Sequence, residues 1–143
     1  MSEFVNTIDL LGDDVVIDSI IDRSITEFKD DVITVVGTRA FNNCKNLLSV
    51  IMPNVTNLAQ ECFRETGLKY LVLSNEKMCT LDNTSVLLDT SIASGTGHIY
   101  VPSALIEDYK AATNWSTYAD QFRALEDYTV DGTTTGELDE SKI

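Results

Sequence analysis

The sequence predicts an α/β solenoid, because the segment at residues 36–74 contains the same apolar unit twice. Phe41 recurs as Phe63 and Val36 recurs as Leu58, in each case 22 residues later. Three further apolar positions recur 21 residues later: Leu47, Val50 and Met52 become Leu68, Leu71 and Leu73. A fixed period of this length is typical of repeat proteins. One unit cannot bury its own apolar face, so stacked units are expected to share one core.

The first copy of the unit has a pattern more specific than its period. It spells AF-x-x-C-x-x-L-x-x-V-x-M-P-N-V-T-x-L from Ala40 to Leu58 and resembles the BspA-like leucine-rich repeat. In that family the Leu-x-x-Val-x-Leu segment forms a strand, and the Ala-Phe segment supplies a buried aromatic side chain on the return. The second copy departs from the pattern at Cys62, Thr66 and Ser74, which stand for Ala, Cys and Pro. The resemblance covers about residues 25–125 and implies a fold, whereas a fold alone does not fix a function.

Four segments are predicted along the chain. In order they are an N-terminal arm and cap, the leucine-rich repeats with a degenerate last one, a helical C-terminal cap and an acidic tail, at residues 1–35, 36–102, 103–125 and 126–143. Caps are expected because the terminal units of a repeat array must shield its open ends. In the tail, Tyr128–Thr129–Val130 followed by Asp131–Gly132 is the pattern of a hairpin with a tight turn.

The N-terminal segment is predicted to combine an extended arm, at residues 1–11, with a helix. The helix is expected to begin at Asp13–Asp14, where acidic side chains would face the positive end of the helix dipole. Its apolar face would consist of Val16, Ile17, Ile20 and Ile21, although β-branched side chains disfavour a helix. Residues 25–28 and 33–36 then predict a first pair of strands, joined by a turn at residues 29–31.

Alignment of the units predicts two ladders of strands. The first ladder joins Val50, Leu71 and Ile99, with Met52, Leu73 and Val101 beside them. The second and shorter ladder joins Ile33, Val55 and Met78, then Val36, Leu58 and Leu81. Since successive side chains of a strand point to opposite faces, the residues between those of the first ladder are expected to face outward.

The outward face of the first ladder is predicted to bind a partner protein. Its two rows are Ile51, Val72 and Tyr100 and, beside them, Ser49, Tyr70 and His98. A sheet face in contact with water normally carries polar residues, whereas this one offers large apolar and aromatic side chains. A contiguous exposed patch of that kind usually marks an interface, and tyrosine suits such a surface. The alternative is that the N-terminal arm or the loop at residues 82–97 folds over these rows.

The last repeat and the C-terminal cap are predicted from spacing and from helical periodicity. Leu71 and Ile99 lie 28 residues apart, so residues 82–97 are expected to form an inserted loop or short helix. Its apolar anchor would be Val86, Leu87 and Leu88. Ser103 predicts the start of a helix with an apolar face formed by Leu105, Ile106, Tyr109 and Ala112. Ser116 predicts a second short helix, and the aromatic stripe there, Trp115, Tyr118, Phe122 and Leu125, is expected to be core.

Composition and charge argue against several classes of function. The net charge of −13 and the pI of 4.2 do not suit a nucleic-acid-binding protein, which needs basic patches. No apolar run approaches the ~18 residues of a membrane span. The N-terminus has acids where a secretory signal has a positive start, so synthesis in a cytosol without Sec export is expected. The two ends are acidic, which is interpreted as an aid to solubility or, alternatively, as a surface for a basic partner.

No motif for catalysis, metal binding or cofactor binding is found, and the chain is predicted not to be an enzyme. Cys44, Cys62 and Cys79 fit neither a disulfide framework nor a zinc site and are expected to be free thiols. His98 is the only histidine, and no serine or cysteine nucleophile pairs with it by motif. Gly95-x-Gly97 precedes a predicted strand, whereas a dinucleotide-binding loop follows one.

The resemblance implies two functions that need no reaction. The segments IDRSITEF and ITVVGTRAF and the ending NWSTYADQFRALEDYTVDGTTTGELDESKI resemble proteins from phage and prophage structural regions of gut bacteria. They imply a virion protein of the tail, baseplate or head appendage, acting in assembly or host-surface recognition. Its partners would be other virion subunits, further copies of itself in a homo-oligomer, or a host cell-surface receptor. The alternative is an adhesin on the bacterial cell surface, or another protein-binding module of the BspA-like family.

Overall fold

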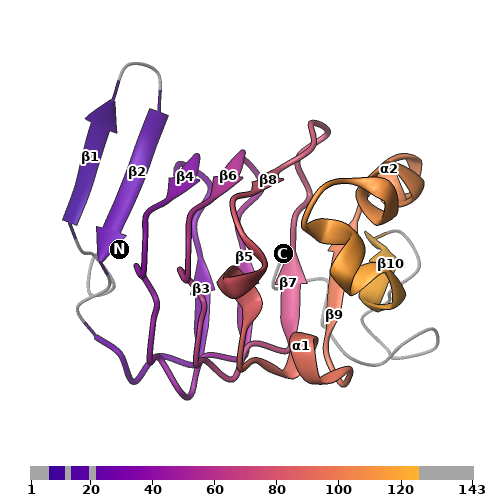
Figure 1. Cartoon of the computed structure of the whole chain (residues 1–143). Helices are drawn as coiled ribbons and strands as arrows, with labels where there is room; N and C mark the ends of the chain where they lie inside the picture. Colours follow the sequence, from indigo (N-terminus) through magenta and orange to yellow (C-terminus); the bar gives the residue numbers. More distant parts are fainter. Residues whose placement is uncertain (1–6, 12–13, 20–21, 126–143) are drawn as a thin grey trace.

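The computed structural model of the chain describes residues 7–11, 14–19 and 22–125, which form a mixed α/β fold. The described strands make two five-stranded sheets (Figure 1). The first has the order β1-β2-β4-β6-β8, with β1 at Thr7–Leu11, β2 at Asp14–Ser19, β4 at Val35–Val36, β6 at Asn57–Leu58 and β8 at Thr80–Leu81. The second has the order β10-β9-β7-β5-β3, with β3 at Glu27–Lys29, β5 at Ser49–Ile51, β7 at Tyr70–Val72, β9 at His98–Val101 and β10 at Phe122–Ala124.

The chain alternates between the two sheets from β2 to β9. Every neighbouring pair of strands is parallel except β1 and β2, which form an antiparallel hairpin. Parallel neighbours need a long crossover connection. From β2 to β9 each crossover passes through the other sheet, whereas the connection from β9 to β10 runs through the helical C-terminal segment. The register joins Val50, Leu71 and Ile99 in one row and Val36, Leu58 and Leu81 in another. The register therefore confirms these two rows of the predicted ladders, including the 28-residue step; the other predicted rows lie outside the residues that it pairs.

The core lies between the two sheets and is filled from both. Inward residues of the first sheet, such as Leu58, and of the second, such as Leu71, belong to one cluster of buried side chains. Three phenylalanines pack in a line through it: the ring centroids of Phe28 and Phe41 lie 4.9 Å apart, and those of Phe41 and Phe63 5.2 Å apart. Phe41 and Phe63 are fully buried at equivalent places, as the repeat alignment predicts.

The connections between the sheets stack through backbone hydrogen bonds. Phe41 N–H donates to the carbonyl of Cys62, and Phe63 N–H donates to that of Val86. The second unit is one residue shorter between Phe63 and Leu68, and Thr66 closes the gap. Its buried hydroxyl donates to Phe63 O at 2.9 Å and accepts from Leu68 N at 3.2 Å. The departure from cysteine at this position therefore supplies two hydrogen bonds that shape the tighter turn.

The C-terminal segment closes the open edge of β8. Its helical parts are η2 at Ser103–Leu105, α2 at Ile106–Ala111 and η3 at Trp115–Gln121. Tyr109 Oη accepts from Cys79 N at 2.7 Å, Trp115 Nε1 donates to Cys79 O at 2.8 Å, and Asn114 Nδ2 donates to Leu81 O at 2.7 Å. Side chains of the helices thus satisfy backbone groups that a further strand would have paired. The aromatic stripe is buried, as predicted, at Trp115, Tyr118 and Phe122.

The inserted loop of the third unit also contains two short helices, η1 at Thr84–Leu87 and α1 at Ser91–Ser94. Val86 and Leu87 are fully buried and anchor it as predicted, whereas Leu88 is 42% exposed. Asn83 and Thr90 cap the two helices through their side-chain oxygens. Ser103 and Ser116 were predicted to cap helices, but neither occupies the N-cap position. The helix η2 begins at Ser103 itself, after Pro102, and η3 begins at Trp115, one residue before Ser116.

Two expectations for the N-terminal segment are wrong. The predicted helix after Asp13–Asp14 is the strand β2, whose β-branched Val16 and Ile17 pair in parallel with Val35 and Val36. The predicted first strand pair does not pair with itself, because β3 and β4 lie in different sheets. Asp30 Oδ1 accepts from the N–H groups of Val32 and Ile33 and shapes the turn that leads from one sheet to the other. The tail hairpin and the first residues of the arm lie outside the described residues.

Candidate functional site

The six residues predicted to bind a partner lie side by side, as expected. Strands β5, β7 and β9 bring Ile51, Val72 and Tyr100 into one row. The same register brings Ser49, Tyr70 and His98 into the adjacent row. Both rows lie on the face of the second sheet that points away from the main core, because they alternate with the inward row of Val50.

The prediction that this face is an exposed interface is wrong for its apolar row. Ile51 is 1% exposed, and Val72 and Tyr100 are 0% exposed. They form a second, small buried cluster, separate from the main core, against which Tyr70 and Leu125 pack. Parallel strands buried on both faces carry near-continuous apolar runs. That pattern is present in SVI, YLV and HIYV. It is typical of a face shielded from water, but it does not distinguish cover by the same chain from cover by a partner.

Of the two covers in the alternative prediction, the loop at residues 82–97 packs elsewhere, and the first residues of the N-terminal arm lie outside the described residues. The loop at residues 82–97 places Val86, Leu87 and Ile92 in the main core between the sheets. Leu125, which directly follows β10, packs against the outer row instead. Leu125 was predicted to belong to the aromatic stripe of the C-terminal cap, so its contact with the row of Tyr100 was missed.

The second row is partly accessible. Ser49 is buried, whereas Tyr70 and His98 are of intermediate exposure. The rings of His98 and Tyr100 meet edge to face at 6.2 Å, and Lys69 Nζ lies 5.5 Å from the centroid of the Tyr70 ring. The accessible part of the predicted surface is therefore small and consists of polar and aromatic side chains. The remaining residues of that surface are buried within this chain and stabilise its fold.

Charged residues that were not predicted extend both rows. Lys29 of β3 lies opposite Ile51, and Glu27 lies opposite Ser49. At the other end, Arg123 of β10 lies opposite Tyr100. The 22-residue period already links Glu27 with Ser49 and Lys29 with Ile51, so extending the alignment one unit towards the N-terminus was the signal that could have found them.

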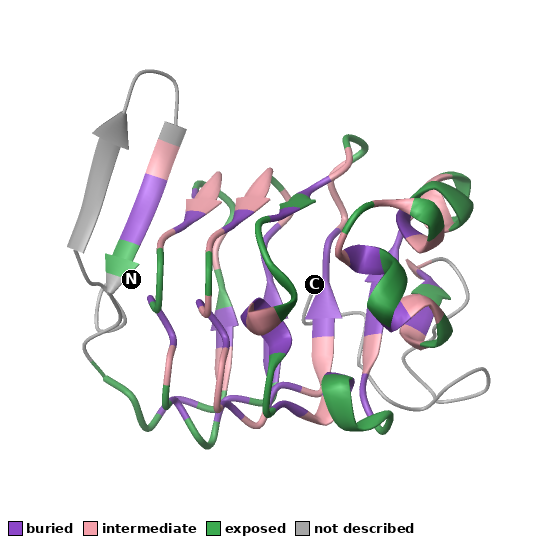
Figure 2. Ribbon diagram, in the orientation of Figure 1, coloured by how far each residue is buried: buried purple, intermediate pink, exposed green. Residues whose placement is uncertain are grey.

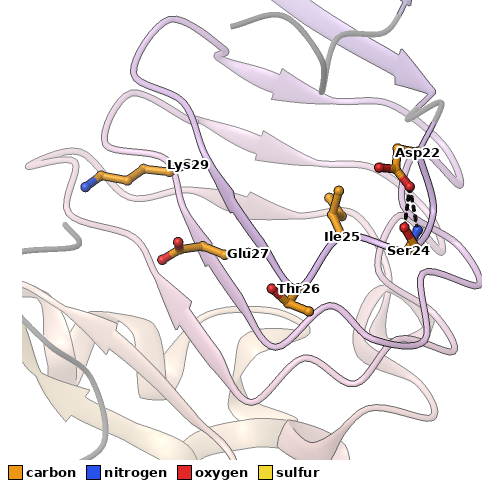
Figure 3. A pocket seen from close by; sticks show the side chains of 6 residues that line it. All are labelled: Asp22, Ser24, Ile25, Thr26, Glu27 and Lys29. Atoms are coloured by element: carbon orange, nitrogen blue, oxygen red, sulfur yellow. Dashed lines mark hydrogen bonds between the residues drawn. The ribbon is translucent and has the colours of Figure 1, made fainter.

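A hollow of about 410 Å³ lies beside β3 (Figure 3). It is lined by Asp22, Ser24, Ile25, Thr26, Glu27 and Lys29. Asp22 Oδ1 accepts hydrogen bonds from Ser24 Oγ at 2.6 Å and Ser24 N at 2.9 Å, and these bonds lower the pKa of the Asp22 carboxyl. In the described part of the chain, Oε2 of Glu27 is shielded from solvent and has no hydrogen-bond partner.

A row of charged side chains follows the connections from the first sheet to the second. Glu61 accepts from Arg39 Nε at 2.7 Å and from Arg64 Nη1 at 2.8 Å. Arg64 Nε also lies 3.7 Å from Asp89 Oδ2. The hydrogen bond from Arg39, together with that from Arg64, lowers the pKa of Glu61. Each acid in this row is matched by a guanidinium, so the row links successive units and leaves little unbalanced charge for a ligand.

The three thiols are poorly placed for nucleophilic chemistry. Cys44, Cys62 and Cys79 are buried and unbridged. Burial raises the pKa of Cys62 and of Cys79 far above the ordinary value. Burial also raises the pKa of Cys44, although the guanidinium of Arg23 nearby acts in the opposite direction. Thiols in such surroundings stay protonated at neutral pH and behave as small apolar side chains.

No protein-family model matches the chain, and no curated protein matches it. Over the described ranges, no helix combines the length and apolar character needed to cross a membrane. Within the same ranges, no three His, Cys, Asp or Glu side chains gather in a group that could hold a metal ion.

Proposed function

We propose that the chain is a short solenoid of the BspA-like leucine-rich repeat type and that it works by binding other protein chains. The solenoid is supported by two parallel ladders that advance together, one through Val36, Leu58 and Leu81 and one through Val50, Leu71 and Ile99. It is also supported by the end of β8, where side chains of Tyr109, Asn114 and Trp115 take the place of a further strand.

The proposed task is structural: assembly or host-surface recognition as part of a phage virion, in a tail, baseplate or head appendage. The observation that carries a binding task is the position of β3, at which the described strands of the second sheet end, beside the hollow lined by Glu27 and Lys29. Open strand edges are sites at which proteins add another chain. The placement in a virion is supported by the sequence resemblance alone.

The test of this task is the composition of phage particles. Prophage induction of the bacterium that encodes the chain, followed by particle purification and mass spectrometry, should recover it in a fixed ratio to the major structural subunits. Antibodies against the chain should label the same place on every particle in electron micrographs. Particles that lack the chain, from lysates that contain it, would contradict the proposal.

A bacterial cell-surface adhesin of the same repeat family is the competing function. It predicts that protease treatment of intact cells releases peptides of this chain, in cultures that produce no particles. Recovery of the chain only from the interior of unlysed cells, and from neither particles nor cell surfaces, would contradict both functions.

A further inference from the structure

The two sheets differ at their N-terminal ends, because a hairpin extends the first sheet and β3 is the last described strand of the second. In the first sheet, β2 and then β1 continue beyond β4, so the N-terminal side is extended by a hairpin. In the second sheet, the described strands stop at β3, which has β5 as its neighbour on one side only (Figure 1). Among the described strands, none pairs with the other side of β3, and its backbone groups on that side are therefore offered to a further strand.

The register with β5 shows which backbone groups these are. Leu48 N–H donates to Thr26 O at 2.8 Å, and Asp30 N–H donates to Ile51 O at 3.1 Å. In a parallel pair, alternate residues of a strand bond to the same neighbour, so Thr26, Phe28 and Asp30 face β5. The N–H and C=O groups of Glu27 and Lys29 therefore face away from β5, towards the open side.

The side chains of β3 are complementary to a second copy of the same strand. The sequence Glu27–Phe28–Lys29 places an acid and a base at equal distances on either side of Phe28. Phe28 is buried in the main core, whereas the side chains of Glu27 and Lys29 extend to the same side of the strand (Figure 3). An antiparallel pairing about a two-fold axis at Phe28 would put Glu27 of each copy opposite Lys29 of the other.

We propose that two copies of this chain pair antiparallel through β3 and form one continuous sheet across the dimer. Glu27 of one copy and Lys29 of the other then exchange two backbone N–H···O bonds, as a hydrogen-bonded pair of an antiparallel sheet does. The two-fold axis repeats this pair, so each contact occurs twice per dimer. Opposite side chains in such a pair have Cβ atoms about 5 Å apart, close enough for an ion pair.

This proposal rests on the proposed binding task and names the partner of the β3 edge, which a virion protein and an adhesin could both use; sedimentation tests the partner, whereas the composition of particles tests the task. The strand has three residues, so the buried area falls below that of standard interfaces and the dimer should be weak. A short edge strand with a lysine is also a common protection against pairing. Self-association therefore decides between a self-complementary edge and a protected one.

Charge reversal provides the experiment, read out by sedimentation velocity at about 10 μM to about 1 mM protein, with enough salt to screen the net charge. The parent chain should shift reversibly from monomer to dimer across this range. Glu27→Lys places two lysines opposite each other twice per dimer, and Lys29→Glu does the same with glutamates. Each single variant should dimerise at least about tenfold more weakly than the parent.

Restoration makes the test specific to this register. The double variant Glu27→Lys/Lys29→Glu should dimerise like the parent, because every opposite pair again joins an acid and a base. A mixture of the two single variants should form a heterodimer although each alone stays monomeric. Glu76→Lys and Lys77→Glu, which make the same charge changes at exposed positions outside β3, should leave the dimer unchanged.

Several outcomes would overturn the proposal. A parent chain that stays monomeric up to about 1 mM shows a protected edge, since even a small interface should associate there. Dimerisation that survives both single reversals, or that neither the double variant nor the mixture restores, places any self-association elsewhere. Equal weakening by the two control variants would trace the effect to overall charge. Circular dichroism melts of every variant establish that the compared proteins are folded.

Discussion

The two sheets of this molecule share one core but differ on their outer faces. The strands β4, β6 and β8 are two residues long, each with one buried and one less buried residue. The strands β5, β7 and β9 are three or four residues long, and their outward Ile51, Val72 and Tyr100 are as buried as their inward residues. Figure 2 shows the contrast in the colours of the two sets of strands. The same repeat thus builds one sheet buried on one face and another buried on both.

The shared core should be the most sensitive part of the molecule. Phe41 packs between Phe28 and Phe63 in the core that the two sheets share. Phe41→Ala should therefore remove packing contacts in successive units and destabilise both sheets. We expect a loss of about 3–5 kcal/mol in the free energy of unfolding, measured by urea denaturation. A loss below about 1 kcal/mol would contradict the placement of Phe41 in the repeat.

Charged substitutions on the two outer faces should sharpen the difference between the sheets. Val72→Lys forces an ammonium into the second cluster and should cost about 2–4 kcal/mol. Thr80→Lys, on the exposed outer position of β8, should change stability by no more than about 0.5 kcal/mol. Similar effects of the two substitutions in urea denaturation would mean that both outer faces are alike.

The C-terminal cap should stabilise the edge strand β8 of the first sheet through its hydrogen bonds to the backbone of Cys79. Tyr109→Phe removes the hydroxyl that accepts from Cys79 N and leaves that buried N–H unsatisfied, at a cost of about 1–3 kcal/mol. Burial raises the pKa of Tyr109 to about 12 in the folded chain. The contribution of the hydroxyl is therefore complete below the unfolded pKa of about 10 and is lost as the pH rises towards 12.

Unfolding measurements across this alkaline range test the assignment. The stability difference between the parent chain and Tyr109→Phe should be constant from neutral pH to about 9 and should shrink above about 10. A difference that does not change with pH would show that the hydroxyl is not the group responsible.

Substitutions in the row of charged side chains should have the smallest effect on stability, because this row lies on the connections between the sheets and outside the core. The pKa of Glu61 is lowered by Arg39 and Arg64, so its contribution is present above the unfolded pKa near 4 and is lost as the pH falls below it. Glu61→Gln should therefore lower the melting temperature slightly at pH 7 and have no effect at pH 2. An effect that persists at pH 2 would contradict an electrostatic origin.

The sequence predicts the inner face of this fold well, and for a clear reason. Leu71 and Ile99 could be aligned over 28 residues because inward positions must stay apolar whatever is inserted between them. The helix predicted at Val16 and Ile17 failed because their neighbours in space lie in β4, some 19 residues later. An apolar run that fits one helical face also fits a strand, and only the partner strand decides between them.

The outer face could not be predicted from the repeat. Ile51, Val72 and Tyr100 would look the same in sequence whether they bound another protein or were covered by their own chain. Their cover includes Leu125, which lies outside the repeat and has no period to reveal it. At β3 the period did place Glu27 and Lys29 in the rows, but only the register with β5 shows which of their backbone groups face away from that strand.

The central claim is that the strands β5, β7 and β9 are buried on both faces along the row of Ile51, Val72 and Tyr100. It is tested most directly by the chemical reactivity of a cysteine placed at residue 72. The three native thiols are buried and should react slowly, which gives a low background. We predict that Val72→Cys reacts with a thiol reagent as slowly as these native cysteines, while Thr80→Cys reacts at the rate of an exposed thiol. Equally rapid labelling at both positions in the folded protein would contradict the claim.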